Sequence, residues 1–413
     1  MGSRREFIKA GAAASAFSVA RVWAARTSER GFPIDEFESR IARRDFRDIT
    51  KDVLPTPAMI VDLDLFQQNI ARMAQQAKST NINVRPHVKV HKSVDAARRQ
   101  IAEGAIGLTC ATIAEAELFS GAGIRNVLWT KQPASVNNIQ RAVALSKKDS
   151  TFMFVADDPL VVDWVEEAAA ARNTKVRIAV SVYASMARQG IENGQPALEL
   201  AQKVAGSKHA RFEGFMAYSG NAAHTKIWEA RRKRSSDDLA GARETVALAR
   251  KSGLPVNFVS GGSTGTYNID HETGLTELEA GSYVFMDTAY FSIGGKEDDK
   301  VYGDFKGALT ILTTVDSKRH PNLATTDYGN KAMTRPTDQV KGMPWLQVGT
   351  QGAEYGSLQW ADADKDLKLG DRVEIYCTNL DMSTNALDRY FVAKGDQVVD
   401  VWPIMGRGGP AQR

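Results

Sequence analysis

Short apolar runs alternate with amphipathic segments through most of this chain. Eight runs have the length and apolar character of strands, and helical periodicity separates most of them. Strands that alternate with helices favour parallel βα units. Eight such units over about 200 residues predict a (β/α)8 TIM-type barrel, with an open doubly wound sheet as the alternative. The predicted strands lie near residues 82–90, 106–110, 126–130, 152–156, 176–182, 212–218, 256–260 and 276–280.

The pattern changes near residue 300. Beyond that point, β-type runs are separated by glycine and aspartate turns, which predicts a mostly antiparallel C-terminal β domain over residues 301–413. We expect the barrel over residues 53–300, preceded by a polar, charged arm over residues 26–52. The short apolar strand at residues 58–62 comes before the first helical pattern, so it can belong to the barrel or to the β domain.

The first 25 residues have the layout of an export signal. Arg4 and Arg5 are followed by a mildly apolar stretch and then by small residues suited to cleavage. This layout is similar to the twin-arginine signal and predicts a periplasmic protein; a frayed basic N-terminus is the alternative. Removing residues 1–25 takes away four cations and one anion, so the formal charge falls from +4 to +1. The basic balance therefore gives no reason to expect a nucleic-acid or membrane partner.

The composition is that of an ordinary globular enzyme. Hydrophobic residues make up 43% and charged residues 25% of the 413 positions, and no apolar run is long enough to span a bilayer. The two cysteines, Cys110 and Cys377, lie in different predicted domains, each inside an apolar strand pattern. We expect two buried free thiols, and the spacing contains no zinc motif.

A dense run of basic side chains follows the start of the first predicted barrel strand. Lys89 stands among Arg85, His87, His91 and Lys92, at the strand end where such a barrel has its active site. Neighbouring cations lower the pKa of a lysine, and a neutral lysine amine is the nucleophile that Schiff-base chemistry requires. His87 is a candidate proton carrier, because an imidazole titrates near neutral pH. A basic surface patch is the simpler interpretation of the run.

Further candidates follow later strands. Arg188 comes just beyond the fifth predicted strand, Tyr218 ends the sixth, and His224 follows a few residues later. The seventh strand ends in the Gly/Ser/Thr loop 260–266, where glycines let backbone N–H groups approach an anion and hydroxyls can donate to it. A plain βα turn has a similar composition. Paired with a Schiff-base lysine, the loop predicts a phosphate-bearing aldehyde cofactor, and pyridoxal 5′-phosphate fits that description.

Six stretches of the chain together resemble the motifs of one known family. They are Pro57–Asp64, Arg85–Lys92, Ser260–Thr264, Glu279–Asp287, Asp388–Arg389 and Val399–Pro403. The family is the D-threonine aldolase / D-serine dehydratase family, which consists of fold-type III pyridoxal-phosphate enzymes with an alanine racemase-like barrel. The resemblance covers roughly residues 53–407. It implies a homodimer in which the barrel opens against the β domain, often that of the partner subunit.

The resemblance also implies roles for individual side chains. Lys89, rather than Lys92, forms the internal aldimine, because the family motif centres on Lys89. Arg188 resembles the arginine that faces the ring oxygen of the cofactor, and Tyr218 resembles a tyrosine that lines the cofactor pocket. The residues implied to lie near the phosphate are Ser260, Gly261, Gly262 and Ser263.

The strand prediction adds a geometric expectation around Lys89. Side chains alternate along a regular strand, and Arg85, His87 and His91 stand at even offsets from Lys89. If the strand continues through the motif, these cations share the face of Lys89 and keep its pKa low. The valines on either side of Lys89 would then pack outward against helices.

The chain departs from the family pattern where a metal is expected. The resemblance implies a divalent metal held by a His-x-Cys or His-x-Asp pair, but this chain has Asn379-Leu380-Asp381. An expected Glu-His-Gly segment is Glu354-Tyr355-Gly356, and no histidine lies beyond residue 320. Asp381 is therefore a candidate ligand for Mg²⁺ or Mn²⁺, which prefer oxygen donors, or a turn aspartate. Tyr355 is a candidate phenolic acid or base, or a packing residue.

The predicted function is a pyridoxal-phosphate-dependent lyase acting on a D-3-hydroxy amino acid, similar to D-threonine aldolase. A D-serine dehydratase-like deaminase and an amino-acid racemase are the enzymatic alternatives. A cofactor-binding protein without activity is the alternative of another class. The cofactor acts as the electron sink, so the surrounding residues decide which bond at Cα breaks.

Overall fold

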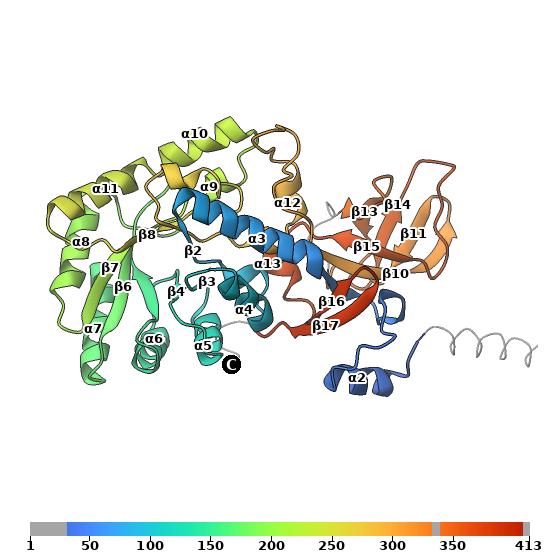
Figure 1. Ribbon diagram of the computed structural model, residues 1–413, viewed down its shortest axis with the longest axis horizontal. Coiled ribbons are helices and arrows are strands. Elements are labelled where there is room, and N and C mark those ends of the chain that lie inside the picture. The colour runs from blue at the N-terminus through green and yellow to red at the C-terminus, as the bar shows by residue number, and fades with distance from the viewer. Residues whose placement is uncertain (1–30, 333–338, 408–413) are drawn as a thin grey trace, which may run out of the picture.

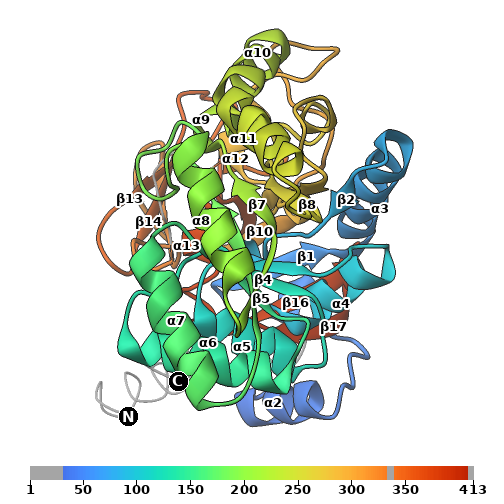
Figure 2. The same ribbon diagram turned by 90° about the vertical axis from the view of Figure 1, so that its left-hand side faces the viewer.

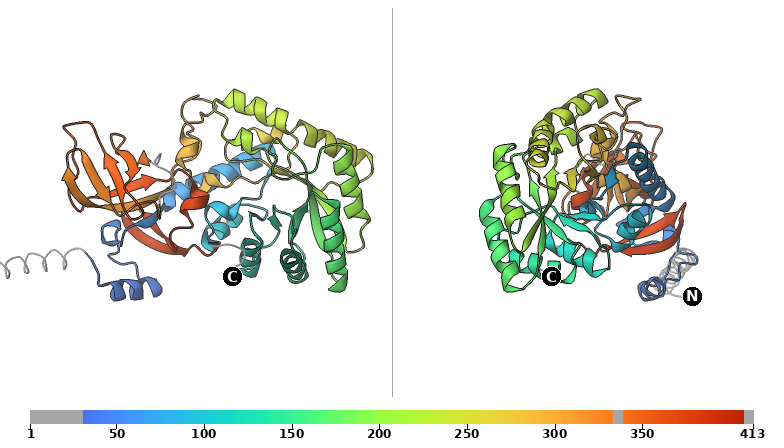
Figure 3. Two further views of the ribbon diagram at one scale, coloured as in Figure 1. Left: turned by 180° about the vertical axis from the view of Figure 1, so that it is seen from behind. Right: turned by 60° about the vertical axis from the view of Figure 1, so that its left-hand side comes forward.

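The computed structural model describes residues 31–332 and 339–407 (Figure 1). The export signal predicted over residues 1–25 lies outside the described residues. Two sheets organise the molecule, and Figures 1 and 3 show them side by side along its long axis. One is an eight-stranded parallel sheet surrounded by helices, and the other is a nine-stranded, mostly antiparallel sheet.

The parallel sheet forms the predicted barrel. Its strand order is β2-β9-β8-β7-β6-β5-β4-β3. Its edges meet through backbone hydrogen bonds of 2.9 Å from Ile106 N to the Val84 carbonyl and from Thr109 N to the Pro86 carbonyl. Each strand overlaps one of the eight predicted runs, so the prediction of fold class is confirmed. The strands are β2 (Asn83–Val84), β3 (Leu108–Cys110), β4 (Val127–Trp129), β5 (Met153–Ala156), β6 (Val176–Ser181), β7 (Ala210–Ala217), β8 (Phe258–Gly261) and β9 (Glu277–Leu278).

Helices cover the outside of the barrel (Figure 2). Several begin at a residue whose side chain accepts a backbone N–H of the first turn, as Asp62, Ser135 and Asp158 do. Thr112 and Glu115 form a complete capping box at the start of α5. The main helices are α3 (Leu63–Thr80), α4 (Val94–Ala102), α5 (Ile113–Gly121), α6 (Val136–Lys148), α7 (Pro159–Ala171), α8 (Gln195–Gly206), α10 (Trp228–Asp238) and α11 (Ala240–Lys251).

The β domain contains the first strand of the chain. β1 (Ala58–Asp62) pairs antiparallel with β10 and parallel with β16, in the path β13-β14-β11-β10-β1-β16-β17. The strand at residues 58–62 therefore lies outside the barrel. The other strands are β10 (Leu309–His320), β11 (Leu323–Thr326), β12 (Gln339–Val340), β13 (Gln347–Thr350), β14 (Gly356–Gln359), β15 (Arg372–Tyr376), β16 (Arg389–Lys394) and β17 (Gln397–Pro403).

The described part of the N-terminal arm packs on the β domain. Its helix α2 (Ile34–Ala42) buries Phe37 against Phe391, with ring centroids 6.1 Å apart. A separate apolar cluster, which includes Ile60 of β1 and Leu312 of β10, surrounds this contact. The arm therefore completes the core of the β domain.

Two further expectations concern side chains and helix length. Cys110 and Cys377 are buried and are not joined in a disulfide, as predicted. Within the described ranges, no helix is long and apolar enough to cross a membrane.

Candidate active site

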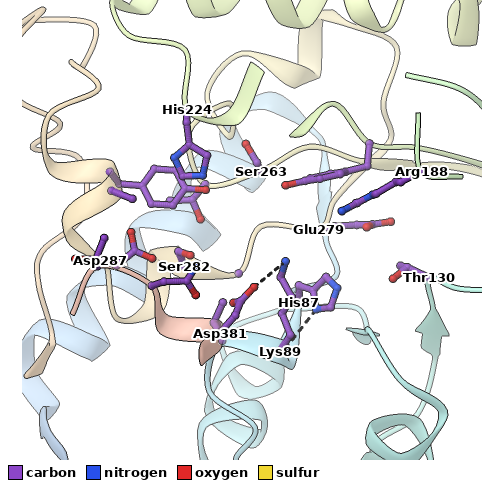
Figure 4. A pocket seen from close by; sticks show the side chains of 18 of the residues that line it. His87, Lys89, Thr130, Arg188, His224, Ser263, Glu279, Ser282, Asp287 and Asp381 are labelled. Atoms are coloured by element: carbon purple, nitrogen blue, oxygen red, sulfur yellow. Dashed lines mark hydrogen bonds and ion pairs between the residues drawn. The ribbon is translucent and has the colours of Figure 1, made fainter. Parts of the chain in front are cut away.

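One pocket lies at the carboxyl ends of the barrel strands, where a short helix of the C-terminal region meets them (Figure 4). Thr130 follows β4, Arg188 follows β6, Tyr218 follows β7 and Ser263 follows β8, and all four line the pocket. The C-terminal region contributes α13 (Leu380–Ser383), with Asn379 and Asp381 at the pocket wall. The structure brings the predicted residues Arg188, Tyr218 and Ser263 together at this pocket, and Thr130 joins them without having been predicted.

Lys89 reaches this pocket from a turn, and the prediction of a strand through residue 90 is wrong. β2 ends at Val84, and the 3₁₀ turn η2 spans Val88–Val90. Pro86 has no N–H to donate to a ladder, and the Nδ1 atom of His87 accepts the N–H of Lys89 at 3.3 Å, which caps the turn. The side chain of Lys89 thus points into the pocket because η2 turns the chain there.

Lys89 faces a carboxylate in the pocket. Its Nζ lies 3.1 Å from Oδ2 of Asp381, and both side chains are partly exposed, at 36% and 39%. Burial alone lowers the pKa of Lys89, but the charge of Asp381, that of Tyr218 and the hydrogen bond to Asp381 outweigh burial and raise the pKa above its usual value. The expectation of a lowered pKa at Lys89 is therefore wrong.

The other cations of the motif do not share a face with Lys89. Arg85 is buried and makes a two-point ion pair with Glu277, at 2.8 and 3.0 Å. His91 is buried, with Nε2 3.1 Å from Oε1 of Gln100, and burial lowers its pKa to about 3. The turn at η2 breaks the alternation of the strand, so the side chains of Arg85 and His91 point in directions different from that of Lys89.

Lys92 is the lysine of this motif whose pKa is lowered. Its side chain is buried under α13, where Nζ donates to the main-chain carbonyl of Asp381 at 2.7 Å and to Oγ1 of Thr384 at 2.8 Å. Burial lowers the pKa of Lys92 to about 8, although the charges of Asp381 and Glu115 oppose the shift. Lys92 therefore supports the helix that carries Asp381, whereas Lys89 faces the pocket.

Arg188, Tyr218 and His87 form the wall beside Lys89. The guanidinium of Arg188 lies 5.4 Å from the ring centre of Tyr218, as a cation–π pair. Burial raises the pKa of the Tyr218 phenol, so it stays neutral near pH 7. Burial and then the charges of Lys89 and Arg188 lower the pKa of His87 well below its usual value. His87 is therefore a neutral imidazole.

Two loops bring hydroxyl groups to the pocket. Ser263 and Thr264 follow β8, and Gly281 and Ser282 lead into the turn η4 (Ser282–Val284). Oγ1 of Thr264 accepts the N–H of Tyr283 at 3.0 Å, which joins the two loops. A Cβ at Gly281 would lie 3.0 Å from the carbonyl oxygen of His87. These hydroxyl and N–H groups fit an anionic phosphate.

The first three residues of the predicted phosphate loop do not line the pocket. Oγ of Ser260 donates to Glu279 at 2.6 Å. A Cβ at Gly261 would lie 2.0 Å from the carbonyl oxygen of Ala217, and Gly262 has φ +74°. The two glycines shape the turn. A larger residue at Gly261 would meet the neighbouring strand, and Gly262 adopts a left-handed conformation that favours glycine. Only Ser263 of the predicted phosphate residues lines the pocket.

Two buried carboxyl groups line the pocket although neither was predicted from the sequence as a site residue. Burial raises the pKa of Glu279 to about 7, against the hydrogen bond from Ser260. Burial also raises the pKa of Asp287 to about 7, and the charge of Asp381 adds to the shift. Both residues belong to the stretch Glu279–Asp287, which resembles a family motif. That resemblance is the sequence signal that could have placed them in the pocket.

His224 lies in the pocket and Tyr355 does not. The ring of His224 lies 4.3 Å from the ring of Tyr290, between centroids, and burial lowers the pKa of His224. Tyr355 stands between β13 and β14 and is 51% exposed. The hairpin carries Tyr355 away from the pocket, so the structure does not place it beside Lys89 within this chain.

The side chains present fit pyridoxal phosphate. The primary amine of Lys89 can bind an aldehyde covalently, and the hydroxyls of Ser263, Thr264 and Ser282 suit its phosphate. Arg188 and Tyr218 flank the space between these two ends. The pocket thus contains the donors that each end of this cofactor requires.

A protein-held divalent metal fits less well. Asp381 pairs with Lys89, and Oδ1 of Asn379 accepts the N–H of Met382 at 3.2 Å. Over residues 31–332 and 339–407, no group of three or more His, Cys, Asp or Glu side chains could hold a metal ion. Among the described residues, the predicted metal role of Asp381 therefore has no set of three such ligands to support it.

Comparisons with known proteins identify the family. The model of the alanine racemase N-terminal domain matches residues 61–289, more than half of the chain, and that of a putative serine dehydratase domain matches residues 308–393. A 3-hydroxy-D-aspartate aldolase of Paracoccus denitrificans (strain Pd 1222) is 32% identical over 360 residues, covering 86% of this chain and 92% of that protein.

Solved structures agree with this match. The crystal structure of D-threonine aldolase from Filomicrobium marinum has a TM-score of 0.81 at 29% identity and covers 86% of this chain and 95% of that one. D-threo-3-hydroxyaspartate dehydratase from Delftia sp. HT23 has a TM-score of 0.75 at 27% identity, with coverage of 86% and 98%. The chain belongs to the D-threonine aldolase / D-serine dehydratase family of pyridoxal-phosphate-dependent lyases, which have an alanine racemase-like fold.

Proposed function

We propose that this protein is an aldolase that cleaves a D-3-hydroxy amino acid and carries pyridoxal phosphate on Nζ of Lys89. The observation that carries the proposal is the position of Lys89 in one pocket with Ser263, Thr264 and Ser282. The pocket thus supplies an amine for the aldehyde of the cofactor and hydroxyls for its phosphate. The names of the relatives from Paracoccus denitrificans and Filomicrobium marinum support the reaction and the D-configuration.

The cofactor, when bound, withdraws electrons from Cα of an attached amino acid. The residues of the chain then control binding and orientation. Ser263 and Thr264 would hold the phosphate through their hydroxyl groups, and Arg188 and Tyr218 line the same pocket. The neutral ring of His87 caps the turn that carries Lys89, which keeps Nζ directed into the pocket.

Lys89 also has a proton-transfer role in this proposal. When the substrate amine displaces Nζ from the cofactor, the free amine of Lys89 can accept or return a proton at Cα. Near neutral pH, Tyr218 keeps its phenolic proton and can donate a hydrogen bond. Lys89 and Tyr218 are therefore suited to hold and move a proton beside Cα of the substrate.

A dehydratase reaction is the second candidate. It is favoured by the likeness to D-threo-3-hydroxyaspartate dehydratase. The two reactions and racemisation give different products from D-threonine. Cleavage gives glycine and acetaldehyde, elimination gives a 2-oxo acid and ammonia, and racemisation gives an L-isomer. Incubation of the cofactor-loaded protein with D-threonine and with D-3-hydroxyaspartate, followed by product analysis, distinguishes the three reactions.

Absorbance tests the cofactor assignment without reference to activity. Protein mixed with pyridoxal phosphate and then dialysed is expected to retain a band near roughly 420 nm, a general property of this cofactor bound to lysine. Lys89→Ala is expected to lose the band, and Lys131→Ala, at the rim outside the pocket lining, is the matched control. A wild-type protein that stays colourless contradicts the assignment, and a coloured protein with none of the three reactions is an inactive binder.

Assembly and location complete the proposal. We propose a homodimer, on the basis of the family resemblance, with the β domain of one subunit next to the barrel of the other. We also propose export to the periplasm through residues 1–25. Analytical ultracentrifugation tests the dimer, and cell fractionation of the full chain against an Arg4→Lys, Arg5→Lys variant tests the export.

A further inference from the structure

Three acceptor groups of the Asn379–Asp381 segment already have partners. Oδ1 of Asn379 accepts the N–H of Met382, which caps α13. The carboxylate of Asp381 pairs with Nζ of Lys89 at 3.1 Å, and its main-chain carbonyl accepts Nζ of Lys92 at 2.7 Å. Two lysines therefore approach Asp381 from the barrel, one at its side chain and one at its backbone.

This charge arrangement opposes a second cation. Lys92 is only 6% exposed and is held on both Asp381 and Thr384. A divalent ion bound by Asp381 would lie close to this fixed ammonium group, and the repulsion between like charges is weakly screened at a buried site.

A neighbouring carboxyl does not complete a metal site. Asp287 is 5% exposed, and its Oδ1 has no hydrogen-bond partner among the described residues. Over the part of the chain that the structure describes, Asp287 and Asp381 are not joined by a further His, Cys, Asp or Glu into a set that could hold a metal ion. Two carboxylates alone leave most positions around a divalent ion unfilled by this chain.

We propose that this protein works without a divalent metal and that the carboxylate of Asp381 contacts the 3-hydroxyl of the substrate directly. The inference rests on the proposed function, since it requires a 3-hydroxy amino acid in the pocket. Once Nζ of Lys89 binds the cofactor, Asp381 loses its ion-pair partner and its oxygens face the pocket. Lys92 is then a positioning residue, because it holds the backbone of Asp381 and does not reach the substrate.

The proposed cleavage step balances without a metal. The 3-hydroxyl gives its proton to Oδ2 of Asp381, and the O–H bonding pair becomes the second C–O bond of the aldehyde product. The Cα–Cβ bond breaks and its electron pair stays on Cα, where the bound pyridoxal phosphate withdraws the charge. Lys89 then gives a proton to Cα in the place of Cβ. Oδ2 of Asp381 passes the proton taken from the 3-hydroxyl to Lys89, so both groups return to their starting protonation.

Metal binding is tested on the protein directly. Mn²⁺ is titrated into the cofactor-loaded wild type and into Asn379→His, with free Mn²⁺ measured by electron paramagnetic resonance. The wild type is expected to bind no stoichiometric Mn²⁺, and Asn379→His, which supplies a second strong ligand beside Asp381, is expected to bind it. Asn379→Asp keeps an oxygen at the helix cap and serves as the second variant if Asn379→His does not fold. Stoichiometric metal in purified wild type overturns the proposal.

Activity supplies the second test. Wild type is expected to keep its rate of aldehyde release after dialysis against EDTA and to gain nothing from added Mn²⁺. Asp381→Asn is expected to lose roughly 10²- to 10⁴-fold in kcat, the usual contribution of a general base, while keeping the cofactor band of Lys89. Asp381→Glu is expected to recover part of the loss. Loss of activity in EDTA that Mn²⁺ restores overturns the proposal.

The two proposals fail in different ways. If the cofactor-loaded wild type releases no product from any of the substrates, the proposed function fails, and the role of Asp381 in cleavage fails with it. The Mn²⁺ titration does not depend on turnover, so it still decides whether the Asn379–Asp381 segment binds a metal.

Discussion

Nζ of Lys89 and Oδ2 of Asp381 lie 3.1 Å apart, although one belongs to the barrel and the other to the helix α13 in the C-terminal region. This ion pair decides the protonation of the lysine. Burial lowers the pKa of Lys89, but Asp381 and Tyr218 raise it by more. The free protein therefore holds Lys89 as a cation, and the amine becomes nucleophilic only when its proton leaves.

Removing this carboxylate is expected to make cofactor binding easier at lower pH. Because the pKa of Lys89 is raised, the neutral amine forms only as pH rises, so Asp381→Asn is expected to shift the midpoint of cofactor incorporation to lower pH. The measurement is the rate of growth of the absorbance band when pyridoxal phosphate is added to the cofactor-free protein across a pH series. Asp364→Asn, an exposed carboxylate of the β domain, is the control. An unchanged midpoint in Asp381→Asn contradicts the role of the ion pair.

Replacing Lys92 is expected to weaken the fold and spare the cofactor. Lys92→Met leaves the Asp381 carbonyl and the Thr384 hydroxyl without the donor that they share, at a cost of about 1–3 kcal/mol in the free energy of unfolding. Denaturant unfolding measures the loss. The absorbance band persists because Lys89 is unchanged, whereas Lys89→Met loses it. A folded Lys92→Met protein without the band would show that the assignment between the two lysines is wrong.

The two serines of the loop after β8 are expected to differ in their effect on cofactor affinity. Ser263 lines the pocket, so Ser263→Ala removes a hydroxyl available to a charged phosphate, worth about 1.5–3 kcal/mol of binding. Ser260 does not line the pocket, and its hydroxyl donates to Glu279. Ser260→Ala is therefore the matched control, with a smaller expected change in cofactor affinity. Equilibrium dialysis against pyridoxal phosphate measures both. Equal losses in the two variants would argue against the phosphate site at Ser263.

Glu279 is expected to make the cofactor-free protein less stable as pH rises. Its pKa is about 7 in the folded chain because of burial, above the unfolded value of about 4.3. The folded protein therefore binds the extra proton between about pH 4 and pH 7, and the free energy of unfolding falls through this window by on the order of 3 kcal/mol. Glu279→Gln is expected to flatten the dependence in denaturant unfolding at pH 5 and pH 8. The exposed Glu244→Gln is the control, and a slope unchanged in Glu279→Gln contradicts the assignment.

Gly262 is expected to be much less tolerant than another glycine of similar backbone conformation. Gly262 has φ +74° and Gly253 has φ +78°, but a Cβ at Gly262 would lie 2.8 Å from both Asp270 and Leu278, whereas nothing lies within 4 Å at Gly253. Gly253→Ala is expected to cost about 1–2 kcal/mol for the left-handed conformation. Gly262→Ala adds about 1–3 kcal/mol of overpacking. Thermal unfolding of the two variants measures the difference, and equal losses would show that the loop relaxes freely.

The barrel was predictable because its signals are local. Helical patterns separate most of the eight apolar runs, and both periods follow from backbone geometry. The position of Lys89, Arg188, Tyr218 and Ser263 at one edge followed from the same pattern, since parallel strands end together. The strand at residues 58–62 was ambiguous because a five-residue apolar run fits either sheet, and only its pairing with β10 and β16 places it.

The directions of the side chains were not predictable in the same way. Sequence spacing placed Arg85, His87 and His91 on the face of Lys89, but the turn η2 directs Arg85 and His91 away from it, while His87 lines the pocket with Lys89. The partners that set the charge of each group, such as Glu277 for Arg85 and Asp381 for Lys89, come from distant parts of the chain.

The sequence by itself determined the strand and helix order and the loss of a histidine before Asp381, because these are properties of residue type and period. Only the tertiary structure decided that Lys89 is paired with a carboxylate, that Lys92 supports the backbone of Asp381 and that Tyr355 lies elsewhere. The reason is physical, because the pKa of a side chain depends on burial and on charges within a few ångströms. The fold brings these charged neighbours together from distant parts of the chain.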